Sequence, residues 1–207
     1  YDMLSRMKAK LDAGRSLLYQ TARYVDIYKA LEDISRDRKL TPDERKEMKK
    51  YSRLADAFTP MAKGMNSEYA NQNAYDAISV HGGSGFIMEY KSQRLYRDAR
   101  IFSIYEGTTQ LQVVAAVRYI TNGTYLNIIK EMAQEEVGDD MKALKARVEK
   151  LIPLYEEAVN KVKEDGNQDE HDFLARRLYD MTADIIMSLL IIRDANEAPE
   201  LFAKSAN

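Results

Sequence analysis

Helical periodicity runs through nearly the whole chain and constrains its fold more than any other feature. Two long stretches repeat apolar residues every three or four positions, which places them on one face of a helix. In the first stretch these residues are Leu4, Met7, Leu11, Leu18, Ala22 and Val25. In the second they are Met48, Tyr51, Ala55, Phe58, Met61, Met65 and Tyr69. No strand-type alternation persists anywhere, so the pattern predicts an all-α protein.

Capping residues and glycines divide this pattern into separate helices. Thr41, Pro42 and Glu44 are typical of a helix start, because together they form a capping box with a proline in the first turn. The helix that begins there is expected to run to about Val80, where "HGGSG" stops it. The stretches "SQRLYRDARIF" and "QLQVVAAVRYI" predict two further helices, the second ending near Asn122.

The last third of the chain predicts a helical hairpin. Its first arm has an apolar stripe of Met141, Leu144, Val148, Leu151, Tyr155, Val159 and Val162. We expect Asp139 or Asp140 to cap its start, Pro153 to kink or break it, and Gly166 to end it. The antiparallel second arm contains "IIMSLLII", which is apolar on all sides and should be deeply buried.

These elements predict an up-and-down helical bundle with an appended helical hairpin. We expect a bundle domain over residues 1–122, a connector over 123–138 and a C-terminal helical extension over 139–207. The chain begins already in helical rhythm, which suggests that it is a fragment of a longer protein. A bundle of this kind says nothing by itself about chemistry.

Composition excludes several classes of site. The chain has no cysteine, so it offers no disulfide, thiolate nucleophile or cysteine-type zinc site, and its two histidines do not favour a metal centre. The net charge of -2 argues against nucleic-acid binding through a broad basic field. No apolar run reaches membrane-spanning length, so we expect a cytoplasmic protein without a membrane role.

Taken singly, the polar residues favour structural roles. His81 follows an apolar helix end and is expected to be a hydrogen-bonded structural histidine. Arg94 and Asp98 are spaced to pair along one helix face. The glycines of "HGGSGF" lack the strand and following helix of a dinucleotide fingerprint. Glu106 alone would be interpreted as a surface acid near a helix N-terminus.

Taken together, three segments carry a resemblance. "HGGSGF", "EYKSQRLYRDARI" and "IYEGTTQLQ", in this order and spacing, resemble the C-terminal helical domain of the acyl-CoA dehydrogenase family. The resemblance covers about residues 1–122 and is most specific over 79–112. It implies the family's bundle fold, with its first helix missing from this chain, and an FAD-dependent enzyme that oxidises an acyl-CoA to the trans-2-enoyl-CoA.

The resemblance also implies roles in the reaction. The glutamate of "YEGT" is the base that takes the α proton in many family members, and here it is Glu106. An ordinary glutamate, with a pKa of about 4.3, is a weak base for such a carbon acid, and burial strengthens it. Tyr105 would supply part of an apolar wall beside the substrate. Gly107 would let the turn bend and the bound groups approach.

Further family positions imply cofactor contacts and an assembly. Thr108 and Gln110 match residues that contact FAD, and the glycine pair Gly82 and Gly83 matches one beside the FAD of a neighbouring subunit. This arrangement implies a homodimer or tetramer. Ser79 departs from the usual glutamine at a position that contacts FAD. An electron-transfer flavoprotein is the electron acceptor that the family implies.

Two other functions stay open at this point. An acyl-CoA oxidase would share the site and pass its electrons to oxygen. A non-catalytic relative on the same fold would show a basic stripe or a lost base, whereas Glu106 is retained and the charges are balanced. Because the family's other flavin-binding and CoA-binding domains lie outside this chain, we expect the 207 residues alone to be inactive.

Overall fold

The computed structural model describes all residues, 1–207, and every regular element is helical. The N-terminal helices are α1 (Asp2–Asp37), α2 (Pro42–His81), α3 (Gly83–Phe86), α4 (Lys91–Ala99) and the 3-10 helix η1 (Arg100–Ser103). The helices α5 (Thr109–Thr121) and α6 (Thr124–Ala133) follow. The C-terminal helices are α7 (Asp139–Glu149), α8 (Leu151–Asp165), α9 (Gln168–Glu197) and α10 (Pro199–Ala206). The predicted all-α fold is confirmed.

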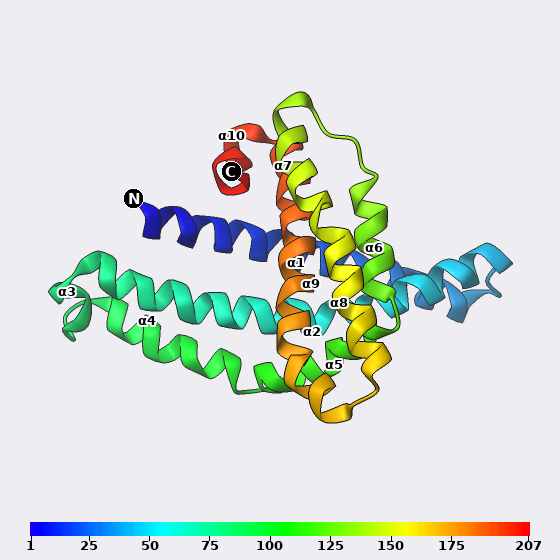
Figure 1. Cartoon of the computed structure of the whole chain (residues 1–207), viewed down its shortest axis with the longest axis horizontal. Helices are drawn as coiled ribbons and strands as arrows, with labels where there is room; N and C mark the ends of the chain where they lie inside the picture. Colours follow the sequence, from blue (N-terminus) through cyan, green and yellow to red (C-terminus); the bar gives the residue numbers. More distant parts are fainter.

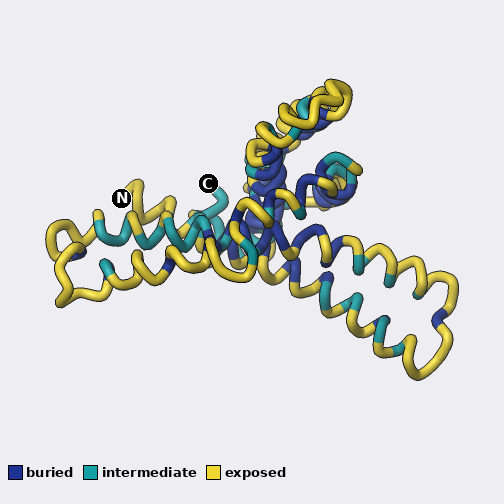
Figure 2. Tube along the Cα trace, turned by 90° about the horizontal axis from the view of Figure 1, so that it is seen from below, coloured by how far each residue is buried: buried dark blue, intermediate teal, exposed yellow.

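Two groups of helices cross to form the core. The long helices α1 and α2 run antiparallel, α4 returns alongside α2, and α8 and α9 cross this group (Figure 1). Buried residues concentrate where the groups cross, while the ends of the long arms stay exposed (Figure 2). One cluster of 35 buried residues includes side chains from both groups. The C-terminal hairpin therefore shares the core of the N-terminal helices.

Several predicted boundaries are confirmed. The Thr41 hydroxyl accepts a hydrogen bond from the Glu44 amide at 3.2 Å, and the Glu44 carboxylate accepts one from the Thr41 amide at 2.8 Å. The second long helix ends at His81, and the helix that was expected to end near Asn122 ends one residue before it. The residues of "IIMSLLII" are buried except for a partly buried serine.

Three local predictions are wrong. Gly138, not Asp139 or Asp140, stands at the N-cap of α7, and no side chain caps this helix. The break predicted from Pro153 is confirmed, at residue 150, but the predicted stripe is wrong at Leu151, which is 48% exposed, while Ile152 is buried instead. Arg94 and Asp98 are both exposed, and the ion pairs of the chain do not include them.

Most of the apolar stripe predicted on α1 is exposed rather than buried, although Met7 and Val25 are partly buried and Val25 packs against the core. Leu4, Leu11 and Leu18 keep 55%, 47% and 51% of their surface exposed. The buried face of α1 is a different one, formed by Asp12, Gly14, Ser16, Leu17, Gln20, Thr21, Tyr24 and Leu31. Because small and polar side chains allow close helix approach, α1 packs through this face although it is less apolar than the stripe.

The hydroxyl groups of two buried tyrosines donate hydrogen bonds to backbone carbonyl oxygens in the middle of α2. Tyr179 of α9 donates to the carbonyl oxygens of Pro60 and Met61 at 3.3 and 3.1 Å, and Tyr125 of α6 donates to that of Ala57. A β-carbon on Gly64 would collide with the Tyr179 hydroxyl, so glycine is required for this contact. The helix continues through Pro60 without interruption.

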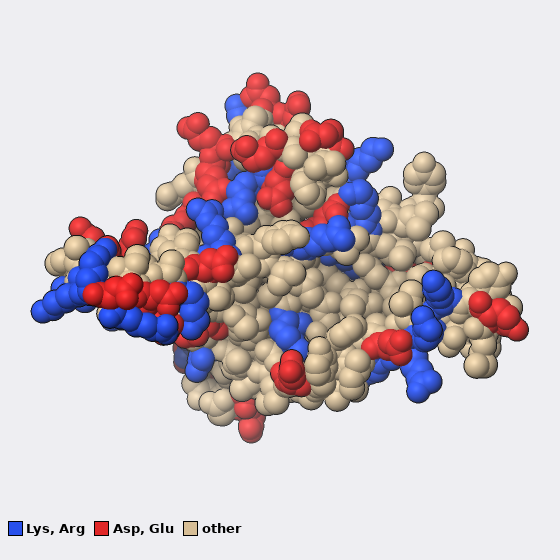
Figure 3. Space-filling view, turned by 180° about the vertical axis from the view of Figure 1, so that it is seen from behind, with Lys and Arg blue, Asp and Glu red and all other residues tan.

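The face opposite that of Figure 1 shows no stripe of one charge. Acidic and basic side chains are mixed at its margins, and a wide uncharged region crosses its middle (Figure 3). No helix of the chain has the length and apolar character needed to span a membrane.

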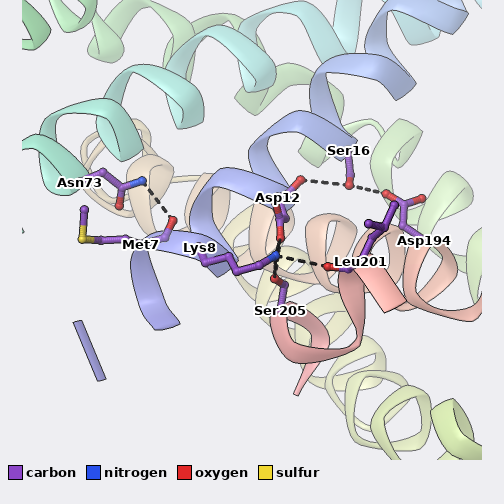
Figure 4. Close-up of polar contacts among 8 residues, drawn as sticks. All are labelled: Met7, Lys8, Asp12, Ser16, Asn73, Asp194, Leu201 and Ser205. Atoms are coloured by element: carbon purple, nitrogen blue, oxygen red, sulfur yellow. Dashed lines mark hydrogen bonds and ion pairs between the residues drawn. The ribbon is translucent and has the colours of Figure 1, made fainter. Parts of the chain in front are cut away.

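A polar cluster joins the C-terminal helix to α1 (Figure 4). The Asp12 carboxylate accepts hydrogen bonds from Lys8 and, at 2.6 Å, from the Ser205 hydroxyl. Burial alone would raise the pKa of Asp12, but the bonds from Lys8 and Ser205 outweigh it and hold this pKa below its usual value. Ser16 similarly joins α1 to Asp194 of α9. The bonds of Lys8 and Asp12 link α10 to α1, and although α10 has no fully buried residue, its Phe202 and Ala206 pack against the core.

Two neighbouring leucines provide a test of which α1 face is buried. Leu17 is fully buried, so Leu17→Ala should reduce the free energy of unfolding by about 2–5 kcal/mol. Leu18→Lys should change it by less than about 0.5 kcal/mol, because Leu18 is half exposed and lysine is a good helix former. Urea unfolding followed by circular dichroism measures both. Equal losses in the two variants would contradict this packing.

Candidate active site

A strained turn lies between η1 and α5. Glu106 has a φ of 50°, and it is the only residue other than glycine with a positive φ. Gly107 follows with a φ of 93°. Non-glycine residues with a positive φ are uncommon and occur preferentially where function requires them. The acid of "YEGT" is therefore held in a conformation that the surrounding structure must enforce, and its carboxylate is exposed.

The backbone of this turn is held from α2. The Lys63 ammonium donates to the carbonyl oxygens of Phe102, Tyr105 and Gly107 at 2.7, 3.1 and 2.6 Å. It also lies 5.7 Å from the centre of the Tyr105 ring, within the range of a cation–π contact. The side-chain amide of Gln112 donates to the Gly107 carbonyl at 3.1 Å. Sequence reasoning missed Lys63, because it resembled the many lysines of solvated helix faces.

The threonines after the turn have different environments. Thr108 is the N-cap of α5, and its hydroxyl accepts a hydrogen bond from the Leu111 amide at 3.3 Å. Thr109 is buried and donates to the Glu68 carboxylate at 2.7 Å. Thr108 and Gln110 are exposed on the outer side of the turn. Thr108 and Gln110, two of the residues predicted to contact a cofactor, are thus accessible, whereas Thr109 has a structural role.

The predicted glycine pair forms an exposed corner after α2. Gly82 has a φ of 60°, and its amide donates to the Ser79 carbonyl at 3.1 Å. A β-carbon on Gly82 or Gly83 would have no atom within 4 Å, so nothing in the chain fills the space beside them. The His81 ring is hydrogen-bonded through Nδ1 to the Ala77 carbonyl oxygen at 2.7 Å, as expected for a structural histidine.

Gly85 is the glycine that the fold of this corner requires, and sequence reasoning did not single it out. It is buried, and a β-carbon there would lie 2.5 Å from the Ile78 carbonyl oxygen. The only sequence signal for it was its place in "HGGSGF".

The glycine corner and the acidic turn are far apart in this chain. Gly82 and Gly83 lie at the tip of the long arm, where α2 ends, and Glu106 lies where η1 meets α5 (Figure 1). Since α4 and η1 run between them, the chain does not bring these two groups into one pocket. The structure thus presents an all-α bundle with an acid on a strained turn and a separate glycine corner.

Comparison with known protein families identifies the family to which the chain belongs. The family model described as "Acyl-CoA dehydrogenase, C-terminal domain" matches residues 1–120, and "Acyl-CoA dehydrogenase C terminal" matches residues 121–207. The chain therefore belongs to the acyl-CoA dehydrogenase family, as a part that corresponds to its C-terminal domains.

The chain is also similar to parts of individual longer proteins, in sequence and in structure. Over 110 residues, 53% of the chain, it is 36% identical to the caffeyl-CoA reductase-Etf complex subunit CarC of Acetobacterium woodii and to the 3-methylmercaptopropionyl-CoA dehydrogenase of Ruegeria pomeroyi. It spans only 23% and 17% of those proteins. A Bacillus anthracis acyl-CoA dehydrogenase crystallised with FAD shares the fold, with a TM-score of 0.70 and 20% identity over 98% of this chain and 37% of that one.

Gly83 and Gly85, which lie two residues apart after α2, allow a matched stability test. Gly85→Ala should destabilise the chain by about 1–3 kcal/mol, because the added methyl group would overlap backbone that cannot move aside. Gly83→Ala should leave stability unchanged or slightly raised, since its β-carbon would meet nothing. The urea concentrations at which half of each variant is unfolded measure this difference in stability. A loss in Gly83→Ala as large as in Gly85→Ala would refute the assignment.

Proposed function

We propose that this chain is the C-terminal part of an FAD-dependent acyl-CoA dehydrogenase in which Glu106 is the catalytic base. The observation that carries the proposal is the backbone of Glu106. The acid of the family's "YEGT" segment is the one non-glycine residue held at a positive φ, and it is exposed on its turn.

The proposed step is a proton transfer at the substrate. The Glu106 carboxylate takes a proton from the carbon next to the thioester carbonyl of an acyl-CoA. FAD, when bound, would supply the acceptor for the hydride that leaves the neighbouring carbon, and loss of the proton and the hydride together would give the trans-2-enoyl-CoA. The carboxylate is exposed in this chain, so substrate and cofactor would be the groups that exclude water from it and strengthen it as a base.

The residues around the turn fit a flavin. The Thr108 hydroxyl uses an acceptor site to cap α5, which leaves its proton free to donate to a flavin oxygen or nitrogen. Gln110 is exposed beside it, with both amide groups available. Tyr105, 45% exposed next to the acid, would provide an apolar wall for the acyl chain. Gly107 lets the turn bend at its positive φ, but the Gln112 side chain fills the space where its β-carbon would stand, at 2.6 Å, so no open space for a bound group lies there.

The position of the glycine corner supports an oligomer. Because α4 and η1 lie between Glu106 and the pair Gly82 and Gly83, the two groups do not line one pocket within one chain. Both have open space where a β-carbon would stand, as a close approach by another group requires. We propose that they, with Ser79, border the FAD of a neighbouring subunit in a homodimer or tetramer.

The electron acceptor distinguishes a dehydrogenase from an oxidase. One relative is named as a subunit of an Etf complex, which favours an electron-transfer flavoprotein as partner. An assay of the full-length protein with an electron-transfer flavoprotein, and separately with oxygen alone, identifies the acceptor. Peroxide formation at the full rate without the flavoprotein would indicate an acyl-CoA oxidase instead.

Replacing the proposed base tests the function. In the full-length protein, Glu106→Gln should lower kcat by about 100- to 10,000-fold, because it removes general-base catalysis and keeps the shape of the side chain. The flavin absorbance spectrum should be retained. Glu47→Gln, an exposed acid on α2, is the matched control and should leave kcat unchanged. Nearly full activity of Glu106→Gln would show that another group is the base.

The chain by itself should lack activity. It spans 23% and 17% of the two relatives' lengths, so most residues that would enclose flavin and CoA lie outside it. We expect the purified 207-residue chain, mixed with FAD and a series of acyl-CoA thioesters, to give no turnover above a Glu106→Gln chain. Turnover that Glu106→Gln abolishes would show that these residues suffice.

A further inference from the structure

The Lys63 ammonium uses its full hydrogen-bonding capacity on one short segment. A lysine ammonium has three donors, and here they go to the carbonyl oxygens of Phe102, Tyr105 and Gly107. Two of these carbonyls flank Glu106 directly in sequence. No side chain on the turn itself makes a comparable set of contacts, so the conformation around Glu106 is determined largely from α2.

Electrostatics explains why a cation is needed at this place. The segment lies between η1 and α5, so its carbonyl groups cannot all find partners within a helix. Three carbonyl oxygens that converge on one point repel one another unless a positive donor lies between them. Lys63 therefore satisfies these groups and stabilises the turn in which Glu106 has its positive φ.

Lys63 is itself held in place. Its helix is fixed at the adjacent turn by the Tyr179 hydroxyl, which donates to the carbonyl oxygens of Pro60 and Met61. The next residue, Gly64, lets that hydroxyl and Gln112 of α5 pack closely against α2, because a β-carbon there would meet both. The ammonium thus projects from one of the most tightly packed parts of the chain, where a positioning group would have to be placed.

We propose that Lys63 is a positioning residue that fixes the direction of the Glu106 carboxylate toward the substrate. The inference rests on the proposed function, in which Glu106 is the base. A displacement of about 1 Å of a reacting group can reduce turnover about 100-fold, so the effect should appear in kcat. Substrate binding does not depend on the carboxylate direction to the same extent, so KM should change little.

The test uses the full-length, FAD-bound protein with Lys63→Met, which keeps length and apolar stem and removes the donors. We expect kcat to fall about 100-fold with KM for the acyl-CoA within about twofold of the original. Amide exchange in residues 104–108 should rise. Lys49→Met, an exposed lysine on the same helix, is the matched control and should change neither. Unchanged kcat and exchange in Lys63→Met would overturn the proposal.

Making Lys63→Met in a protein that already carries Glu106→Gln separates a positioning role of Lys63 from a general loss of stability. If Lys63 acts through the base, Lys63→Met should cause no further loss of kcat in a Glu106→Gln protein. A further loss of similar size in that background would overturn the positioning role. An active Glu106→Gln protein would instead refute the proposed function, and the exchange of residues 104–108 would still report on Lys63.

Gln112→Ala provides a milder variant in case Lys63→Met does not fold. It removes only the second donor to the Gly107 carbonyl, so kcat should fall by less than in Lys63→Met, with exchange of the same segment raised. Turnover and exchange both equal to those of the unchanged protein would contradict the idea that donors to this turn position Glu106.

Discussion

The contact between the Tyr179 hydroxyl and the backbone of α2 is the interaction on which the other features depend. It joins the C-terminal hairpin to the long N-terminal helices at the centre of the core, with the phenol fully buried. Burial raises the pKa of Tyr179 above its usual value, so the hydroxyl stays a donor. Gly64 makes the contact sterically possible, and Lys63 beside it faces the turn that holds Glu106.

The sequence predicted those features of the fold that depend only on neighbouring residues. The capping box of Thr41 and Glu44 involves only neighbouring residues, and it formed as expected. The break near Pro153 and the left-handed Gly166 depend on backbone sterics within one turn, and both are present. The prediction failed at Asp139 and Asp140, where either acid suits a helix start but the preceding Gly138 took the cap position.

Features that depend on distant partners were not predictable in the same way. The apolar stripe of Leu4, Leu11 and Leu18 is as regular as a core face, yet periodicity does not say which partner covers it, and in this chain none does. Lys63 looked like any surface lysine because its acceptors lie about forty residues away, on a segment whose conformation the sequence does not specify. The family resemblance singled out Glu106 but not the group that holds its backbone.

The backbone position of Glu106, the proposed base, and the environment of its carboxylate depend on different parts of the protein. The conformation of the Glu106 turn depends on α2, α5 and the hydrogen bonds of Lys63 and Gln112, all within this chain. The basicity that the proposed reaction needs depends on removal of water, and the carboxylate is exposed here. In the proposed function, the chain therefore sets the position of the Glu106 carboxylate, and the bound flavin, the substrate and the rest of the protein would set its strength as a base.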